Sequence, residues 1–169
     1  MSVLPCYVLD TNTIIDLHFG GLLDKVFRLP CTFSVTDSLA IEFIDPPFHV
    51  LQELGLCFEP LAEEAVADIS PFMERYPLPS YYDITVLLLA RSKNTVLITG
   101  DNALRNAAAD NGVDCRGTCW LIDYLANEGL ITYTEAIAAY DVIRKKPRYP
   151  PKGECDTLLA GWKRRQKLE

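Results

Sequence analysis

Four acidic residues lie where a parallel α/β sheet gathers its ligand-binding groups. Asp10 closes one apolar run and Asp101 closes another, while Glu42 and Asp83 lie near the starts of two segments with helical patterning. Strand-end and helix-start carboxylates meet in the crevice beyond the carboxyl ends of parallel strands. Carboxylates gathered there repel one another and are costly to desolvate unless a cation neutralises them. The spacing therefore predicts a metal site.

The residues beside these acids favour a hard divalent cation. Thr11 and Asn12 follow Asp10, and Thr99 precedes Asp101 by two residues. Oxygen-rich groups of this type suit Mg²⁺ or Mn²⁺. Such an ion orients a phosphate and makes bound water a better nucleophile. A single strand-end Asp is commonly only a cap or turn residue, but four acids in this order favour the metal site.

Strand-like and helix-like segments alternate along the chain. Asp37 or Ser38 opens the predicted helix that carries Glu42, and Ser80 caps the one that carries Asp83. Strands separated by helices of this length predict βαβ units and a parallel sheet covered on both faces. Strands are predicted at about 6–10, 31–36, 56–61, 96–99 and 113–115, and further helices over 14–29, 49–54, 62–76 (kinked or divided at Pro71), 102–111, 119–127 and 134–146.

The length and the cysteines bound the class of protein. A chain of 169 residues fits one domain with its own core. The longest uncharged run, residues 1–9, is too short for a membrane span. A signal peptide is not expected, because the N-terminus has no basic residue before its apolar stretch. Cys6, Cys31 and Cys57 lie in or beside strand-like runs, where free Cys behaves as a small hydrophobe. Without a Cys-x-x-Cys motif zinc is not expected, and the predicted location is the reducing cytoplasm.

The net charge of −7 hides an asymmetry along the chain. Residues 144–169 hold nine of the sixteen Lys and Arg residues but three of the 23 acids, a local balance of +6 that leaves −13 elsewhere. Phosphate contacts come from Lys and Arg, so the acidic body disfavours polyanion binding and the C-terminal end favours it. We expect residues 1–146 to form the domain and residues 147–169 to form a basic tail that starts with a Pro-rich linker at 147–153.

The sequence resembles the PIN domain family of metal-dependent nucleases, particularly the bacterial VapC-like toxins. The resemblance runs from the N-terminus to about Leu125. The motifs that carry it are Leu9-Asp10-Thr11-Asn12 with Ile14-Ile15-Asp16-Leu17, then Ser38-Leu39-Ala40-Ile41-Glu42-Phe43, then Tyr82-Asp83 with Leu87-Leu88-Leu89-Ala90, and finally Leu97-Ile98-Thr99-Gly100-Asp101-Asn102-Ala103-Leu104-Arg105.

The resemblance implies a three-layer α/β/α sandwich around a central parallel sheet and cleavage of RNA by a Mg²⁺- or Mn²⁺-dependent endoribonuclease. The resemblance also implies a homodimer, which the apolar residues of 14–23 favour as well. For a toxin it further implies inhibition by an antitoxin protein. The site residues that it implies are Asp10, Asp83 and Asp101 as metal ligands, Glu42 as a further catalytic acid, and Asn12 and Thr99 as supporting groups.

Basic residues are the candidates for RNA contacts. Arg105 lies one helical turn from Asp101, so it reaches a phosphate or pairs with an acid. Arg144, Lys145 and Lys146 cluster before the linker and are predicted to bind RNA. The alternative from another class is a PIN-like binding or scaffold protein with little catalysis, and a Mn²⁺ titration discriminates between the two.

Overall fold

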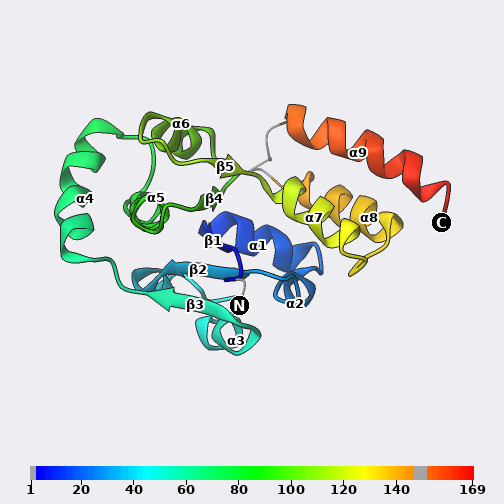
Figure 1. The fold of residues 1–169 in the computed structure, drawn as a ribbon, viewed down its shortest axis with the longest axis horizontal. Coiled ribbons are helices and arrows are strands. Elements are labelled where there is room, and N and C mark those ends of the chain that lie inside the picture. Colours follow the sequence, from blue (N-terminus) through cyan, green and yellow to red (C-terminus); the bar gives the residue numbers. More distant parts are fainter. Residues whose placement is uncertain (1–2, 147–151) are drawn as a thin grey trace.

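A five-stranded parallel sheet forms the centre of the computed structural model, which describes residues 3–146 and 152–169 (Figure 1). The strand order is β3-β2-β1-β4-β5, so the first strand lies in the middle and the chain crosses over it to reach β4. This is the parallel sheet that the alternating pattern predicts. The strands are β1 (Cys6–Leu9), β2 (Thr32–Thr36), β3 (Leu56–Glu59), β4 (Val96–Ile98) and β5 (Cys115–Arg116).

The pairing of β1 with β4 brings two of the predicted site residues to one edge of the sheet. Leu9 is in register with Ile98, so the strands end level with each other and Asp10 and Thr99 are the first residues beyond them. The strands are held by burial, because Leu9 and Ile98 are fully inaccessible to solvent. The sheet order reverses direction at this pair, which makes its carboxyl end the ligand-binding crevice of an open α/β sheet.

Helices cover the sheet on both sides and complete a three-layer α/β/α sandwich, as predicted (Figure 1). The helices α4, α5 and α6 pack together on one side, and α1, α2, α7 and α8 pack together on the other. Their bounds are α1 (Thr11–Phe19), α2 (Leu23–Val26), α3 (Phe48–Leu54), α4 (Glu63–Arg75), α5 (Tyr81–Lys93), α6 (Asn102–Asp110), α7 (Thr118–Asn127), α8 (Tyr133–Ile143) and α9 (Lys152–Gln166).

One local prediction was wrong. The segment that carries Glu42 is a short 3₁₀ helix, η1 (Asp37–Ile41), and Glu42 is its C-terminal cap. The two prolines at 46 and 47 disfavour helical geometry in the residue before each of them, which limits this segment to little more than a turn. Pro71 lies inside α4, but the helix continues past it as one element.

The apolar residues near α1 are mostly internal. Ile14, Leu17, Leu22 and Leu23 are buried, whereas Phe19 is about half exposed. The expectation that this stretch presents an apolar face for dimerisation was therefore wrong for most of its side chains. None of the helices in the described ranges is long and apolar enough to cross a bilayer.

The C-terminal helix α9 packs against α7 and α8 (Figure 1). Trp162 is buried and its Nε1–H donates to Asp123 Oδ1 at 2.8 Å. Cys155 forms a disulfide with Cys119 of α7, a pairing that the sequence analysis did not anticipate. Most of the predicted linker, residues 147–151, lies outside the described residues. The division of the chain into a domain and a tail at residue 147 stays a prediction.

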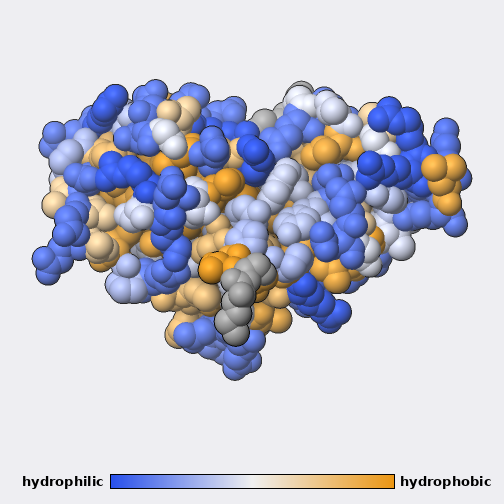
Figure 2. All heavy atoms as spheres, in the orientation of Figure 1, coloured by the Kyte–Doolittle hydropathy of each residue, from blue (hydrophilic) through white to orange (hydrophobic). Residues whose placement is uncertain are grey.

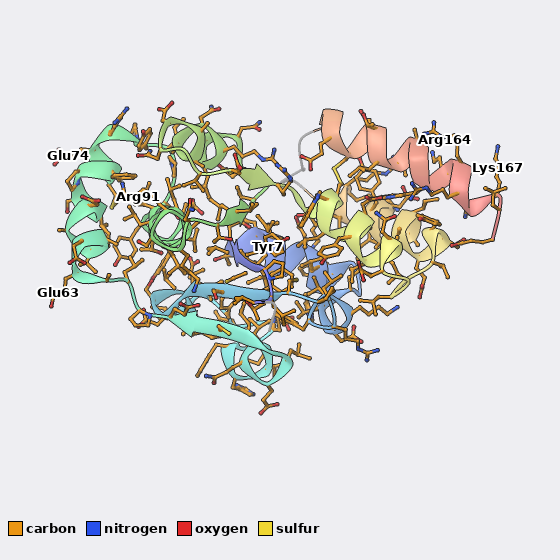
Figure 3. All side chains as sticks on the ribbon, viewed as in Figure 1. Tyr7, Glu63, Glu74, Arg91, Arg164 and Lys167 are labelled. Carbon is orange, nitrogen blue, oxygen red and sulfur yellow. A yellow bond between two sulfur atoms is a disulfide. The ribbon has the colours of Figure 1, made fainter. Side chains whose placement is uncertain are left out.

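The surface charge follows the sequence asymmetry. Hydrophilic side chains cover α4 and much of the outer end of α9 in the space-filling view (Figure 2). Glu63 and Glu74 lie on α4 at one end of the molecule, and Arg164 and Lys167 lie on α9 at the other (Figure 3). The acidic end, marked by Glu63 and Glu74, and the basic end, marked by Arg164 and Lys167, therefore lie at opposite ends of the long axis of the molecule.

Candidate functional site

Asp10 is the most buried of the predicted ligands. Its side chain is inaccessible to solvent and caps α1 by accepting the backbone N–H of Thr13 at 2.7 Å. The Thr99 hydroxyl donates a short hydrogen bond to the other carboxylate oxygen. The backbone N–H of Asp10 donates to Ile98 O at 3.1 Å, which fixes Asp10 at the end of β4. These contacts fix the Asp10 carboxylate in one orientation.

Asp101 is tied to the same position through Thr99. The Asp101 N–H donates to Thr99 Oγ1 at 3.1 Å, so one hydroxyl links the two strand-end acids. The Asp101 carboxylate caps α6 by accepting the N–H of Leu104 at 2.7 Å. Capping by Asp satisfies a free backbone donor of the helix and also places negative charge at its positive end. Thr99 thus bonds to both Asp10 and Asp101.

Asp83 and Glu42 approach from the other side. Asp83 forms a capping box with Ser80, in which Asp83 Oδ2 accepts the Ser80 N–H at 2.8 Å. Glu42 is exposed, and its Oε2 accepts the hydroxyl of Thr11 at 2.9 Å. Both carboxylates therefore have fixed partners on one oxygen.

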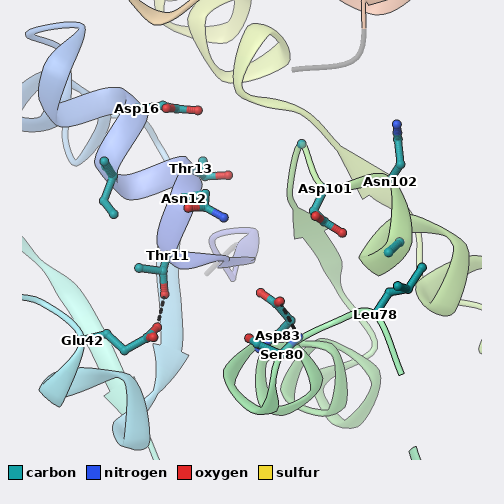
Figure 4. Close-up of a pocket in the computed structure, with 13 residues that line it drawn as sticks. Thr11, Asn12, Thr13, Asp16, Glu42, Leu78, Ser80, Asp83, Asp101 and Asn102 are labelled. Carbon is teal, nitrogen blue, oxygen red and sulfur yellow. Dashed lines mark hydrogen bonds between the residues drawn. The ribbon is translucent and has the colours of Figure 1, made fainter. Parts of the chain in front are cut away.

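These groups surround one pocket of about 760 Å³ (Figure 4). Asn12, Glu42, Asp83 and Asp101 line it, whereas Asp10 and Thr99 are buried and bonded to the lining residues Thr13 and Asp101. The structure brings all six predicted active-site residues to this place. The full lining is Thr11, Asn12, Thr13, Ile15, Asp16, Glu42, Leu78, Ser80, Asp83, Gly100, Asp101, Asn102 and Ala103.

Asp16 is a pocket residue that the sequence analysis did not nominate. It lies four residues after Asn12 on α1, so the two share a helix face that points into the pocket (Figure 4). Burial, with a smaller contribution from the charge of Asp10, raises the pKa of Asp16 to about 7. The i, i+4 spacing from Asn12 is the sequence signal that identifies this position.

Burial also raises the pKa of Asp10 to about 6, and the hydrogen bonds from Thr13 and Thr99 oppose this shift. Asp10 and Asp16 thus resist ionisation in the metal-free protein. A nearby cation favours the charged form of a carboxylate and relieves this cost. The two raised pKa values mark carboxylates whose ionised forms are poorly solvated because they are buried.

This electrostatic cost predicts a pH-dependent stability. Because the folded pKa of Asp16 lies above the usual 3.8, the folded protein holds more protons than the unfolded chain between those values. The stability that the folded protein keeps while Asp16 is protonated is fully present below about pH 4 and is lost as the pH rises through about 7. We expect Asp16→Asn to raise the urea midpoint of metal-free protein at about pH 8 and to change it little at about pH 4. An equal change at both pH values would contradict the assignment.

The donor set fits Mg²⁺ or Mn²⁺. Carboxylate, hydroxyl and amide oxygens line the pocket, and no thiol or imidazole is among the lining residues. Within the described residues, no three His, Cys, Asp or Glu side chains converge on one point. The carboxylates are spread around the pocket instead, the arrangement that mutual repulsion favours.

The predicted RNA-binding residues lie outside this pocket. Arg105 forms an ion pair with Glu154 at 3.2 Å, the acid-pairing alternative of the sequence analysis. Arg144 pairs with Asp141 at 2.9 Å, and Lys145 is exposed. Lys146 lies over the ring of Phe19. Its charge also acts on Asp16, where it partly offsets the rise in pKa that burial causes.

Comparison with known proteins agrees with this architecture. A family model described as a PIN domain matches residues 6–164, from the first residue of β1 into α9. A search of curated proteins found no match. Since the matched segment holds the whole sheet and every pocket residue, the chain belongs to the PIN domain family.

Proposed function

We propose that the protein is a Mg²⁺- or Mn²⁺-dependent endoribonuclease. PIN domains are generally nucleases, and the observation that carries the proposal is the single pocket that Glu42, Asp83 and Asp101 line above the buried Asp10. A phosphodiester is an anion, so a pocket of carboxylates binds it only with a cation between them.

The residues divide the work by position. Asp10, Asp83 and Asp101 would hold the ion, which when bound would stabilise the charge of the phosphate and activate water. Glu42 stands across the pocket from Asp101, lies in solvent and orients the attacking water. The Thr99 hydroxyl keeps Asp10 and Asp101 in fixed relation. Positioning of this type lowers the barrier by removing orientational freedom.

A Mn²⁺ titration of the intact protein tests the proposal. We expect binding near one ion per chain by calorimetry, with release of protons below about pH 7 because the raised pKa of Asp16 and Asp10 must fall on binding. Asp110→Asn, at the far end of α6, serves as a matched control that removes one surface carboxylate. Absence of Mn²⁺ binding together with harmless expression would favour the second candidate, a PIN-like binding or scaffold protein. The spread of the carboxylates around the pocket is the observation that favours that candidate.

We further propose the setting of a toxin–antitoxin pair, with an antitoxin protein as partner, a homodimer as the assembled form and the cytoplasm as location. The RNA contacts would come from Arg144, Lys145 and Lys146 and from the exposed basic residues of α9, of which Arg164 and Lys167 lie at the basic end of the molecule (Figure 3). In a reducing compartment the Cys119–Cys155 pair is expected as two free thiols, since disulfides are rare there. Thiol counting on protein purified under alkylation decides this point.

A further inference from the structure

Arg105 connects three separate segments of the chain. Its Nε–H donates to the Thr99 carbonyl at 2.8 Å, just beyond β4. Its Nη2 forms the ion pair with Glu154 Oε2 at 3.2 Å, and Glu154 Oε1 accepts the N–H of Gly117 at 3.4 Å. The loop after β4, the loop after β5 and the start of α9 therefore meet at one guanidinium.

The residue that Arg105 holds is the one that joins the strand-end acids. The Thr99 side chain donates to Asp10 and accepts from the Asp101 N–H, while the Thr99 carbonyl accepts from Arg105. Movement of the Thr99 peptide would therefore shift the hydroxyl away from the Asp10 carboxylate and from the Asp101 N–H. Arg105 acts on the pocket through one residue and lines no part of the pocket.

Gly117 has no side chain in the space that the Arg105 guanidinium occupies. A Cβ atom on Gly117 would lie 2.8 Å from Arg105 Nη2 and 3.4 Å from Glu154 Oε2. The guanidinium is the far end of a flexible side chain, so a methyl group there would displace it at little cost to the backbone. The absence of a side chain at Gly117 therefore allows Arg105 to reach both Thr99 and Glu154.

We infer that Arg105 is a positioning residue of the carboxylate pocket and that Glu154 makes α9 part of the catalytic unit. The inference rests on the proposed function, since it concerns the metal-binding geometry of the same pocket. Groups that orient metal ligands contribute strongly to affinity, and their loss typically weakens metal binding by about 10- to 100-fold.

The test compares Arg105→Gln with Arg91→Gln in the full-length protein. Arg91 pairs with Asp68 between α5 and α4, does not line the pocket, and like Arg105 is partly buried. We expect Arg105→Gln to raise the Mn²⁺ dissociation constant by about 10-fold or more and to lower kcat with little change in KM. The matched Arg91→Gln variant should lose thermal stability without a change in Mn²⁺ affinity.

A second readout needs no metal. The Asp101 amide bonds to Thr99 Oγ1, so its hydrogen exchange in metal-free protein reports whether Thr99 is held. We expect faster exchange at Asp101 in Arg105→Gln and in Gly117→Ala, and unchanged exchange in Arg91→Gln. Gly117→Ala covers the case in which Arg105→Gln does not fold, because it retains the arginine and only displaces its guanidinium.

The outcomes separate this inference from the proposed function. Unchanged Asp101 exchange in both Arg105→Gln and Gly117→Ala overturns the positioning role, whatever the Mn²⁺ affinity of these variants. Faster exchange with no Mn²⁺ binding in the wild-type protein leaves the link to Thr99 intact but overturns the proposed metal site and, with it, the catalytic meaning of the link. A higher KM with unchanged kcat and Mn²⁺ affinity overturns the inference in favour of direct RNA contact by Arg105.

Discussion

Asp83→Asn and Asp101→Asn should each reduce RNA cleavage by about 10³-fold or more, because a metal ligand contributes several kcal/mol of transition-state stabilisation. Both substitutions keep the local fold. Asn at 83 still offers an oxygen to the Ser80 N–H, and Asn at 101 still accepts from the Leu104 N–H at the start of α6. The loss would therefore report charge and coordination, measured as single-turnover cleavage of an RNA substrate in Mn²⁺.

The controls for this prediction come from the same elements. Asp110→Asn removes a carboxylate from the far end of α6 and should leave cleavage unchanged. Asp10→Asn is the less clean variant, because Asp10 accepts the Thr13 N–H on one oxygen and the Thr99 hydroxyl on the other. Full activity in either of the first two variants, or in excess EDTA, would refute the proposed mechanism.

Much of the sheet could be predicted because its strands carry a local signal. Buried parallel strands are short continuous apolar runs, and β1 and β4 are two such runs, each followed directly by an oxygen-bearing residue. The position of Asp10 and Asp101 at one edge follows from strand polarity alone. The segment before Pro46 was harder, since helical patterning and a 3₁₀ turn share the same spacing over so few residues.

The arrangement within the site required the structure. Spacing predicts that Asp83 and Asp101 begin helices, but the use of one carboxylate oxygen for each cap depends on side-chain rotamers. The ion pair of Arg105 with Glu154 joins residues 49 positions apart, and no local pattern connects them. Likewise, Cys119 and Cys155 are separated by 36 residues and lie on helices that meet only in the folded chain.

The basic character of the C-terminal end conceals a structural element. Arg165 donates to Asn127 Oδ1 at 2.9 Å and to the Tyr133 hydroxyl at 2.8 Å, so its charge serves packing between helices. Lys163 and Arg164 are exposed on the same helix. Composition could not distinguish these roles, because a helix that packs on one face and is solvated on the other has the same overall charge as a free tail.

Removal of α9 should therefore destabilise the whole domain. Trp162→Ala isolates this effect, because its side chain is 1% exposed and lies edge-on to the buried Tyr140, with ring centroids 6.3 Å apart. Replacing a buried Trp with Ala typically costs about 3–5 kcal/mol through lost burial and the cavity that remains. The substitution also leaves Asp123 Oδ1 without its indole donor. The free energy of unfolding, measured by urea denaturation of the oxidised protein, should fall by that amount.

Two further variants of α9 give this prediction its specificity. Trp162→Phe keeps most of the volume but removes the Nε1–H, so it should cost about 1–3 kcal/mol, less than Trp162→Ala. Lys163→Gln changes the neighbouring exposed residue and should stay within about 0.5 kcal/mol of the wild-type protein. If Trp162→Ala were no more destabilising than Lys163→Gln, α9 would be a dispensable tail. A loss confined to Trp162→Ala and Trp162→Phe would instead show that the domain requires the C-terminal helix, and RNA-binding tests of the basic end would then need charge substitutions in place of truncation.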